Sequence, residues 1–221
     1  MTQPRNGRRP LIVGRPALIM VDFQRGGAYV PGEENGIPRM SGSEERNRIG
    51  RTLVTAARAS AIPVVFIQEV HRPDGIDFGR ELDGREDVHC LEGLRSTEIA
   101  AEQVDFRPGD YLVPKRRYSA FYGTDLEILL KGLKVQTLIL AGGLTDVCVH
   151  YSFVDAHQGD YYCRVVEDGV IGSSVDAHDA ALRAMEYLQS GARRQSTEIL
   201  RAFAAWKGTD APLTEPLGEP A

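Results

Sequence analysis

The sequence predicts an α/β protein: a three-layer α/β/α sandwich on a doubly wound, mainly parallel six-stranded sheet. Two observations lead to this fold class. Short apolar runs of strand length alternate with helix-length segments, and these runs are apolar at successive rather than alternate residues. Continuous apolar runs are typical of strands buried on both faces. Helical segments between such strands imply parallel pairing with right-handed crossovers.

Six strands and the helices between them can be placed along the chain. The apolar runs predict strands at 17–22, 64–67, 111–115, 137–141 and 164–167, and a weaker one at 193–196. Helices are predicted at 43–60, 124–130, 146–158 and 173–191, with a last one ending near Trp206. Ser41 or its neighbour, Thr124 and Ser173 offer the side-chain oxygens that cap helix starts. The charged segment 70–110 is too long for a simple loop, so we expect it to be functional or to carry short elements.

Length and composition suit one domain spanning residues 1–221, with a core of about 11–207 between polar ends. The net charge of −5 argues against a nucleic-acid partner, which normally requires a basic face. No apolar run reaches the ~20 residues of a membrane helix, and no apolar leader follows the basic N-terminus. Three scattered cysteines do not make a disulfide framework. We therefore expect a cytoplasmic protein that binds neither nucleic acid nor membrane.

Three ionisable side chains lie at the carboxyl ends of predicted strands. Asp22 ends the first strand, Lys115 ends the third, and Cys148 lies just past the fourth. Because ligands of doubly wound sheets bind outside this edge, we expect the three to converge there. Cys148 falls in the first turn of a helix, where free amides favour a thiolate, and a nearby Lys115 would lower its pKa further. Asp22 can take the thiol proton and return it to a leaving amine, while backbone amides form an oxyanion hole.

The residues around these three resemble a known family. The stretches are Val-Asp-Phe-Gln at 21–24, Pro-Lys-Arg-Arg-Tyr-Ser-Ala-Phe at 114–121 and Gly-Gly-Leu-Thr-Asp-Val-Cys-Val at 142–149. They are similar to the three motifs of the isochorismatase-like cysteine hydrolases, and the likeness runs from about residue 15 to 203. The resemblance implies a six-stranded parallel sheet, a homodimer or homotetramer, and an amidase triad of Asp22, Lys115 and Cys148. It also implies a cis peptide bond, expected at Leu144–Thr145, which would aim backbone amides at the substrate's carbonyl oxygen.

Further residues are candidates for binding the substrate. Leu144 and Thr145 are expected at the oxyanion hole. Gln24 either orients a polar substrate or caps the turn after the first strand. Arg117 either holds an anionic substrate or pairs with a carboxylate of a helix or a neighbouring subunit. Tyr118 and Phe121 either wall a small pocket or belong to the core, and Cys90 and Cys163 are expected to take no part in catalysis.

The resemblance also narrows the reaction. Isochorismatases proper, which cleave a vinyl ether, lack a cysteine at position 148. The nicotinamidases carry a metal site with an Asp-x-His and a further His, and the stretch 68–74 lacks that Asp-x-His. His71 and His89 could join Asp74 or Asp77 at a metal, but we predict no metal and no cofactor.

The stretch at 115–121 is most similar to the branch that hydrolyses ureides and carbamoyl compounds, such as biuret, triuret and ureidoacrylate. We therefore expect a hydrolase that cleaves a carbon–nitrogen bond of a small amide or ureide through a thioester and releases ammonia or an amine. An isochorismatase-type ether hydrolase and a nicotinamidase are the enzymatic alternatives. A non-enzymatic binding protein on the same fold is the third.

Overall fold

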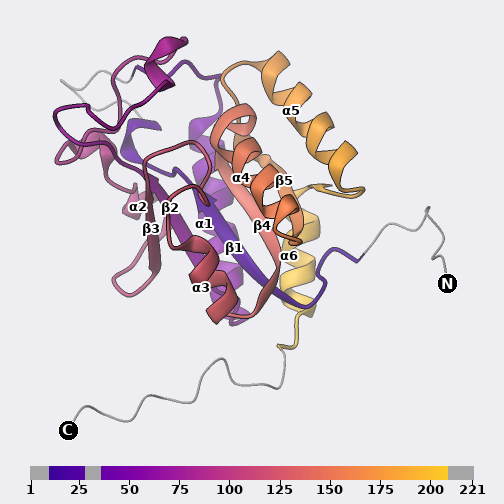
Figure 1. The fold of residues 1–221 in the computed structure, drawn as a ribbon. Coiled ribbons are helices and arrows are strands. Elements are labelled where there is room, and N and C mark those ends of the chain that lie inside the picture. Colours follow the sequence, from indigo (N-terminus) through magenta and orange to yellow (C-terminus); the bar gives the residue numbers. More distant parts are fainter. Residues whose placement is uncertain (1–9, 28–35, 209–221) are drawn as a thin grey trace, which may run out of the picture.

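The computed structural model describes residues 10–27 and 36–208, which are organised around one six-stranded sheet (Figure 1). Its strand order is β3-β2-β1-β4-β5-β6, and all neighbouring strands are parallel. The strands are β1 (Arg15–Val21), β2 (Val64–Glu69), β3 (Tyr111–Lys115), β4 (Val135–Gly143), β5 (Tyr162–Ile171) and β6 (Arg193–Arg194). The direction of winding reverses between β1 and β4, which makes this the switch point of a doubly wound sheet. The predicted fold class is confirmed.

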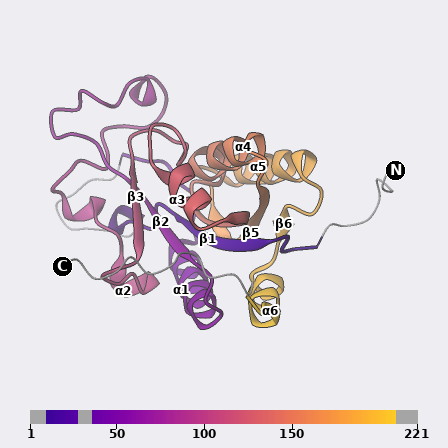
Figure 2. The same ribbon diagram turned by 60° about the horizontal axis from the view of Figure 1, so that its bottom comes forward.

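Helices cover both faces of the sheet (Figures 1 and 2). On one face lie α1 (Ser43–Ala59) and α6 (Ser196–Ala205), with the short α2 (Ala101–Val104) beside α1. On the other face lie α3 (Leu126–Gly132), α4 (His150–Gln158) and α5 (Val175–Leu188). Among the helices of the described ranges, none has both the length and the apolar character that crossing a bilayer requires.

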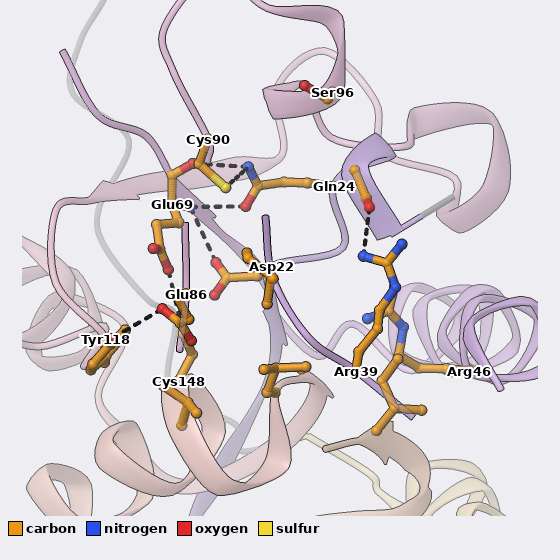
Figure 3. A pocket seen from close by; sticks show the side chains of 16 residues that line it. Asp22, Gln24, Arg39, Arg46, Glu69, Glu86, Cys90, Ser96, Tyr118 and Cys148 are labelled. Carbon is orange, nitrogen blue, oxygen red and sulfur yellow. Dashed lines mark hydrogen bonds between the residues drawn. The ribbon is translucent and has the colours of Figure 1, made fainter. Parts of the chain in front are cut away.

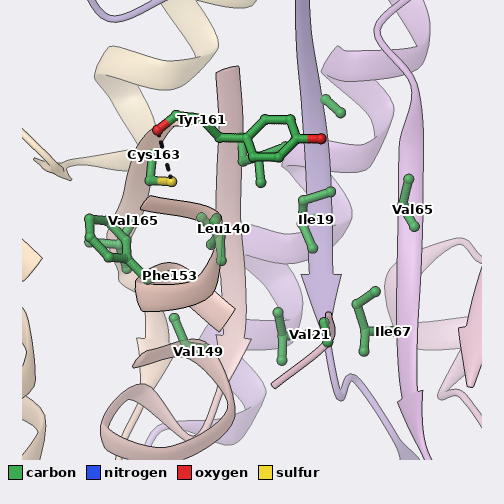
Figure 4. Packing of buried hydrophobic residues seen from close by; sticks show 14 of the residues in the cluster. Ile19, Val21, Val65, Ile67, Leu140, Val149, Phe153, Tyr161, Cys163 and Val165 are labelled. Atoms are coloured by element: carbon green, nitrogen blue, oxygen red, sulfur yellow. Dashed lines mark hydrogen bonds between the residues drawn. The ribbon is translucent and has the colours of Figure 1, made fainter. Parts of the chain in front are cut away.

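The two layers of helices explain why the strands are apolar at successive residues. In β1, Ile19 and Val21 point into the core under α3, α4 and α5, where they meet Val65, Leu140 and Phe153 (Figure 4). The residues between them belong to a second buried cluster under α1 and α6. A strand covered on both sides buries every side chain, so its sequence loses the alternation of a half-exposed strand.

The helix starts differ in detail from those predicted. The first helix follows Gly42, whose φ of 114° lies in the left-handed region, and no side chain caps it. At α5 the capping oxygen belongs to Ser174, which accepts a hydrogen bond from the amide of Ala177. The predicted helix at 146–158 begins as a π-helical turn, Thr145–Val149, and continues as α4. Segment 70–110 does carry short elements, namely α2 and two 3-10 helices.

Gly142 allows β4 to approach β1 closely at the carboxyl edge. Its φ is 129°, and a Cβ at this position would lie 1.9 Å from the carbonyl oxygen of Val21. Only glycine therefore fits here without moving the strand. The close pairing of Val21 with Gly142 brings the turn after β4 next to the residue after β1.

Candidate active site

Asp22, Lys115 and Cys148 come together at the carboxyl edge of the sheet. Asp22 follows β1, Lys115 ends β3, and Cys148 lies in the π-helical turn after β4. The Lys115 ammonium nitrogen is 3.1 Å from an Asp22 carboxylate oxygen and 3.4 Å from the Cys148 sulfur. Lys115 is fully buried, and Cys148 is 6% exposed. The predicted convergence is thus present, and it follows from parallel strands that end at one edge.

A second carboxylate, Glu69 at the end of β2, completes this group and was missed by the sequence analysis. Glu69 Oε2 accepts a hydrogen bond from Lys115 and lies 3.3 Å from the Cys148 sulfur, which donates to it. The backbone N–H of Glu69 donates to an oxygen of Asp22 at 3.1 Å. A buried ammonium therefore sits between two carboxylates and a thiol. The sequence carried the signal, because Glu69 follows a predicted strand closely, much as Asp22 does.

The charges of the site set its proton affinities. Burial raises the pKa of Asp22 to about 6 and outweighs the opposing effect of Lys115. Burial also raises the pKa of the Cys148 thiol well above its usual range, and although Lys115 opposes this shift, Glu69 and Asp22 add to it. Burial alone would lower the pKa of Lys115, but Asp22, Cys148 and Glu69 raise it well above the ordinary value. These shifts favour a thiol at Cys148, beside a carboxylate with a near-neutral pKa, although Lys115 acts on the thiol pKa in the predicted direction.

Behind Glu69 lies a buried cluster of two histidines and a further glutamate. His89 Nε2 is 3.0 Å from Glu69 Oε1, and His71 Nε2 is 3.4 Å from the same oxygen. Glu81 lies 3.2 Å from His71 Nε2. Burial would lower the pKa of His71, but hydrogen bonds with Glu69 and Glu81 raise it to about 9. Burial would likewise raise the pKa of Glu69, yet Lys115, His71 and His89 hold it well below its ordinary value.

This cluster contains the donor set of a metal site. The ligand atoms of Glu69, His71, Glu81 and His89 lie within 4.8 Å of one another. Imidazoles and carboxylates suit a divalent transition-metal ion, which these residues could hold. Without an ion, protonated His71 supplies the positive charge between the carboxylates. The sequence pattern here is Glu-x-His, so the predicted absence of a metal, argued from a missing Asp-x-His, stays a prediction.

A cavity of about 70 Å³ opens beside the Cys148 sulfur (Figure 3). A water needs ~10–15 Å³ of such space, so the cavity admits a molecule of a few heavy atoms. Its lining comes from the residues between β1 and α1, the start of α1, the end of β2, the 70–110 segment, the loop after β3, the end of β4 with the turn that follows it, and the end of β5. The lining residues are Asp22, Gln24, Gly26, Ile37, Arg39, Arg46, Glu69, Glu86, Cys90, Ser96, Tyr118, Gly143, Leu144, Val147, Cys148 and Ile171.

Three of the predicted substrate-binding residues line this cavity, namely Leu144, Tyr118 and Gln24. The Tyr118 hydroxyl donates to Glu86 at 3.0 Å. The Gln24 side-chain amide, however, is hydrogen-bonded to backbone groups. It donates to the carbonyl oxygens of Glu69 and Thr97, and its oxygen accepts from the N–H of Glu69. Gln24 thus links the residues after β1 to the end of β2 and to Thr97, and the two roles expected for it, orienting a polar substrate or capping the turn, stay predictions.

The other three predicted substrate-binding residues, Thr145, Arg117 and Phe121, are not part of the cavity lining, and their expected roles in binding the substrate stay predictions. The Thr145 side chain is fully buried, with its hydroxyl 2.8 Å from His178 Nδ1. Arg117 donates hydrogen bonds to the backbone carbonyl oxygens of Asp77 and Arg116. Among the described residues it makes no ion pair with a helix carboxylate. Phe121 packs on the hydrophobic core, because that side of the loop after β3 faces α4 rather than the sheet edge.

The predicted cis peptide bond is present one residue earlier than expected. It joins Gly143 to Leu144, not Leu144 to Thr145. Gly143 has no Cβ that could crowd the residue after a cis bond, whereas the Cβ of Leu144 would crowd Thr145. The cis bond therefore directly follows the last residue of β4 and precedes the turn that carries Cys148.

The fold and the site together define a doubly wound α/β protein with a buried cysteine at the switch point of its sheet. Comparison with known proteins assigns the chain to a family. The isochorismatase domain family matches residues 16–199, so the chain belongs to the isochorismatase family. The predicted class of enzyme, a hydrolase, and the predicted family are confirmed.

Curated relatives and solved structures agree with this placement. The chain is 30% identical to ureidoacrylate amidohydrolase RutB of Methylorubrum extorquens over 189 residues, which are 76% of this chain and 75% of that protein. It is 29% identical to the protein of the same name from Yersinia enterocolitica, over 77% and 81% of the two chains.

A cysteine hydrolase from Pseudomonas syringae has the same fold, with a TM-score of 0.75 at 24% identity over 93% of this chain and 99% of that one. Nicotinamidase PncA from Bacillus subtilis also has it, with a TM-score of 0.67 at 24% identity over 82% and 99%. At this identity these likenesses concern the fold alone.

Proposed function

We propose that this protein is a cysteine-dependent amidohydrolase that cleaves a carbon–nitrogen bond of a small ureide or carbamoyl compound through a thioester. The observation that carries the proposal is the contact of a cavity-lining thiol, Cys148, with Asp22, Glu69 and the Lys115 ammonium. The relatives named ureidoacrylate amidohydrolase support the substrate class.

In the first half of the reaction the thiol is activated as it attacks. The Cys148 sulfur lies within 4.8 Å of an Asp22 carboxylate oxygen, and the Asp22 pKa of about 6 leaves that carboxyl mostly ionised at neutral pH and ready to accept a proton. The Cys148 sulfur forms a bond to the substrate's carbonyl carbon while its proton passes to Asp22. The carbonyl π electrons move to oxygen, and backbone amides of the turn at 144–148 are the candidate donors to that oxyanion.

In the second half the intermediate collapses and is hydrolysed. Asp22 returns its proton to the leaving nitrogen as the carbon–nitrogen bond breaks, so ammonia or an amine departs and a thioester remains on Cys148. A water molecule then loses a proton to Asp22 and attacks the thioester carbon. The carbon–sulfur bond breaks, the sulfur regains the proton, and an acid or carbamate leaves. Lys115 stays protonated throughout and balances the charge that passes between sulfur and carboxylate.

Ammonia release from a small panel tests this proposal. The panel contains biuret, triuret, ureidoacrylate, N-carbamoyl amino acids and nicotinamide. Cys148→Ala should abolish turnover of every accepted compound, whereas the matched variant Cys163→Ala, in the buried β5, should keep it. A Cys148→Ala protein that retains wild-type turnover would disprove the thiol mechanism. Turnover of nicotinamide alone would favour the nicotinamidase alternative, with which the glutamate–histidine cluster is compatible.

We also propose, from the three scattered cysteines, that the protein is cytoplasmic and, from the family resemblance, that it works as a homodimer or homotetramer. Sedimentation of the purified chain tests the assembly. A monomer at micromolar concentration would contradict it without bearing on the chemistry of Cys148.

A further inference from the structure

Two arginines line the cavity at Asp22, on the side away from Cys148. Figure 3 shows Arg39 and Arg46 on one side of Asp22, and Glu86 and Tyr118 on the other. Arg46, near the start of α1, is 4% exposed. Among the described residues, no carboxylate oxygen lies within salt-bridge distance of either guanidinium. Because a buried cation without a counter-ion is unfavourable, this pair needs an explanation.

Arg46 is held firmly and presents one nitrogen at the cavity wall. Its Nε and Nη2 both donate to Asn47 Oδ1, at 3.1 and 2.9 Å, and its guanidinium lies 4.8 Å from the centre of the Phe23 ring. The remaining nitrogen, Nη1, is 3.1 Å from where a Cβ on Gly143 would lie, and Gly143 is itself part of the cavity wall. Nη1 makes no hydrogen bond to any described residue.

Arg39 adds a second positive charge to the same side. One of its terminal nitrogens donates to the carbonyl oxygen of Gly26 at 2.7 Å, and its other N–H groups have no acceptor among the described residues. Burial and the charge of Arg39 lower the pKa of Arg46 to about 10, so Arg46 remains charged at neutral pH. The two guanidinium groups repel each other unless an anion lies between them.

The opposite side of the cavity offers acceptors. The half-buried Glu86 carboxylate lies there with the Tyr118 hydroxyl, next to the carboxylates of Asp22 and Glu69. Carboxylate oxygens accept hydrogen bonds from the N–H groups of a urea or amide. The cavity is therefore cationic at one end and rich in acceptors at the end that holds the thiol.

We propose that Arg46, assisted by Arg39, binds a carboxylate of the substrate and so selects ureido carboxylic acids over neutral ureides. The inference rests on the proposed amidohydrolase function and specifies its substrate. Arg46 Nη1 and the N–H groups of Arg39 that make no bond to a described residue can both donate to a carboxylate, whose negative charge then lies between the two guanidiniums. The ureido group then reaches Cys148, with its N–H groups toward Glu86.

A matched pair of substrates tests this assignment: a ureido carboxylic acid, N-carbamoyl-β-alanine, and propylurea, which has the same ureido chain without the carboxylate. The wild type should prefer the acid. Arg46→Gln should raise the KM for the acid at least ~30-fold and change kcat/KM for propylurea far less. Arg46→Lys keeps the charge but not the guanidinium that Asn47 holds, so its KM for the acid should lie between those of the wild type and Arg46→Gln. The control Arg48→Gln, on the exposed face of α1, should match the wild type.

The outcomes separate the two proposals. If Arg46→Gln lowers kcat/KM equally for both substrates, or if the wild type prefers propylurea, the carboxylate assignment is wrong, although a Cys148-dependent release of ammonia still stands. If neither compound is hydrolysed, calorimetry can compare the affinity of the acid for Cys148→Ala with its affinity for the double variant that also carries Arg46→Gln. Equal affinity overturns the assignment, and affinity lost with Arg46→Gln supports it. If Arg46→Gln does not fold, Arg39→Gln carries the same comparison.

Discussion

Replacing Lys115 by methionine tests whether the buried ammonium holds the site together. Methionine keeps the approximate length of lysine and removes its charge. Asp22 and Glu69 would then be buried without the cation that now lies at hydrogen-bonding distance from each. Breaking a buried ion pair by removing one partner costs about 3–5 kcal/mol. For a chain of this size, about 2–4 °C per kcal/mol gives a fall in melting temperature of about 6–20 °C.

The loss should depend on pH in a definite direction. The folded-state pKa of Asp22 lies above its ordinary value even with Lys115 present. Removing Lys115 raises it further, since Lys115 opposes the effect of burial. A group whose folded pKa is raised contributes stability at low pH that is lost as pH rises through that pKa. The variant should therefore lie closest to the wild type near pH 5 and furthest from it near pH 8.

Thermal unfolding followed by circular dichroism between pH 5 and 8 measures both effects. The control is Lys131→Met, which removes an exposed lysine paired with Glu127 on α3 and should unfold close to the wild type at every pH. If Lys115→Met and Lys131→Met unfold at the same temperature at pH 8, Lys115 is not the counter-ion of buried carboxylates. The electrostatic account of the site would then be wrong.

Two further predictions concern the chemistry around Glu69. The kcat/KM for an accepted ureide should fall below about pH 6, because Asp22 must be ionised to take the thiol proton and its pKa is about 6; a profile that stays flat to about pH 4.5 would remove Asp22 as the base. Dialysis against a chelator should leave activity and melting temperature unchanged, because His71 already balances Glu69 and Glu81. One equivalent of a divalent ion in the purified protein would contradict this.

The fold was largely predictable because its strands are buried on both faces. Such strands leave continuous apolar runs in the sequence, and the run at 17–22 corresponds closely to β1. The ends of elements were less predictable. The second strand was expected to stop at Ile67 but continues to Glu69, which joins β3 through the pairing of Glu69 with Lys115. Because the predicted strand ended two residues early, the sequence prediction assigned Glu69, a carboxylate of the candidate site, to a loop.

Parts of the site could not be predicted because tertiary structure assembles them. His89 and Glu81 meet His71 only through the path of the 70–110 segment, which has no periodic pattern to reveal it. Arg46 did leave a signal. It lies three residues before the buried Ile49 and seven before the buried Leu53, so it belongs to the apolar stripe of α1 rather than to the solvent face. A charged residue in such a stripe indicates a binding role or a buried pair.

The state of Cys148 shows why spacing alone does not determine reactivity. Its place in the first turn after β4 favours a thiolate, and Lys115 favours it further. Burial outweighs both, and the two carboxylates at the same edge add to its effect, since a thiolate would be a third negative charge around one ammonium. In the proposed mechanism the nucleophile therefore forms as its proton leaves for Asp22, which keeps the charge of the group constant during attack. A substrate that positions its carbonyl carbon over the sulfur would trigger that step, so the proposal makes the binding groups of the cavity control reactivity as well as affinity.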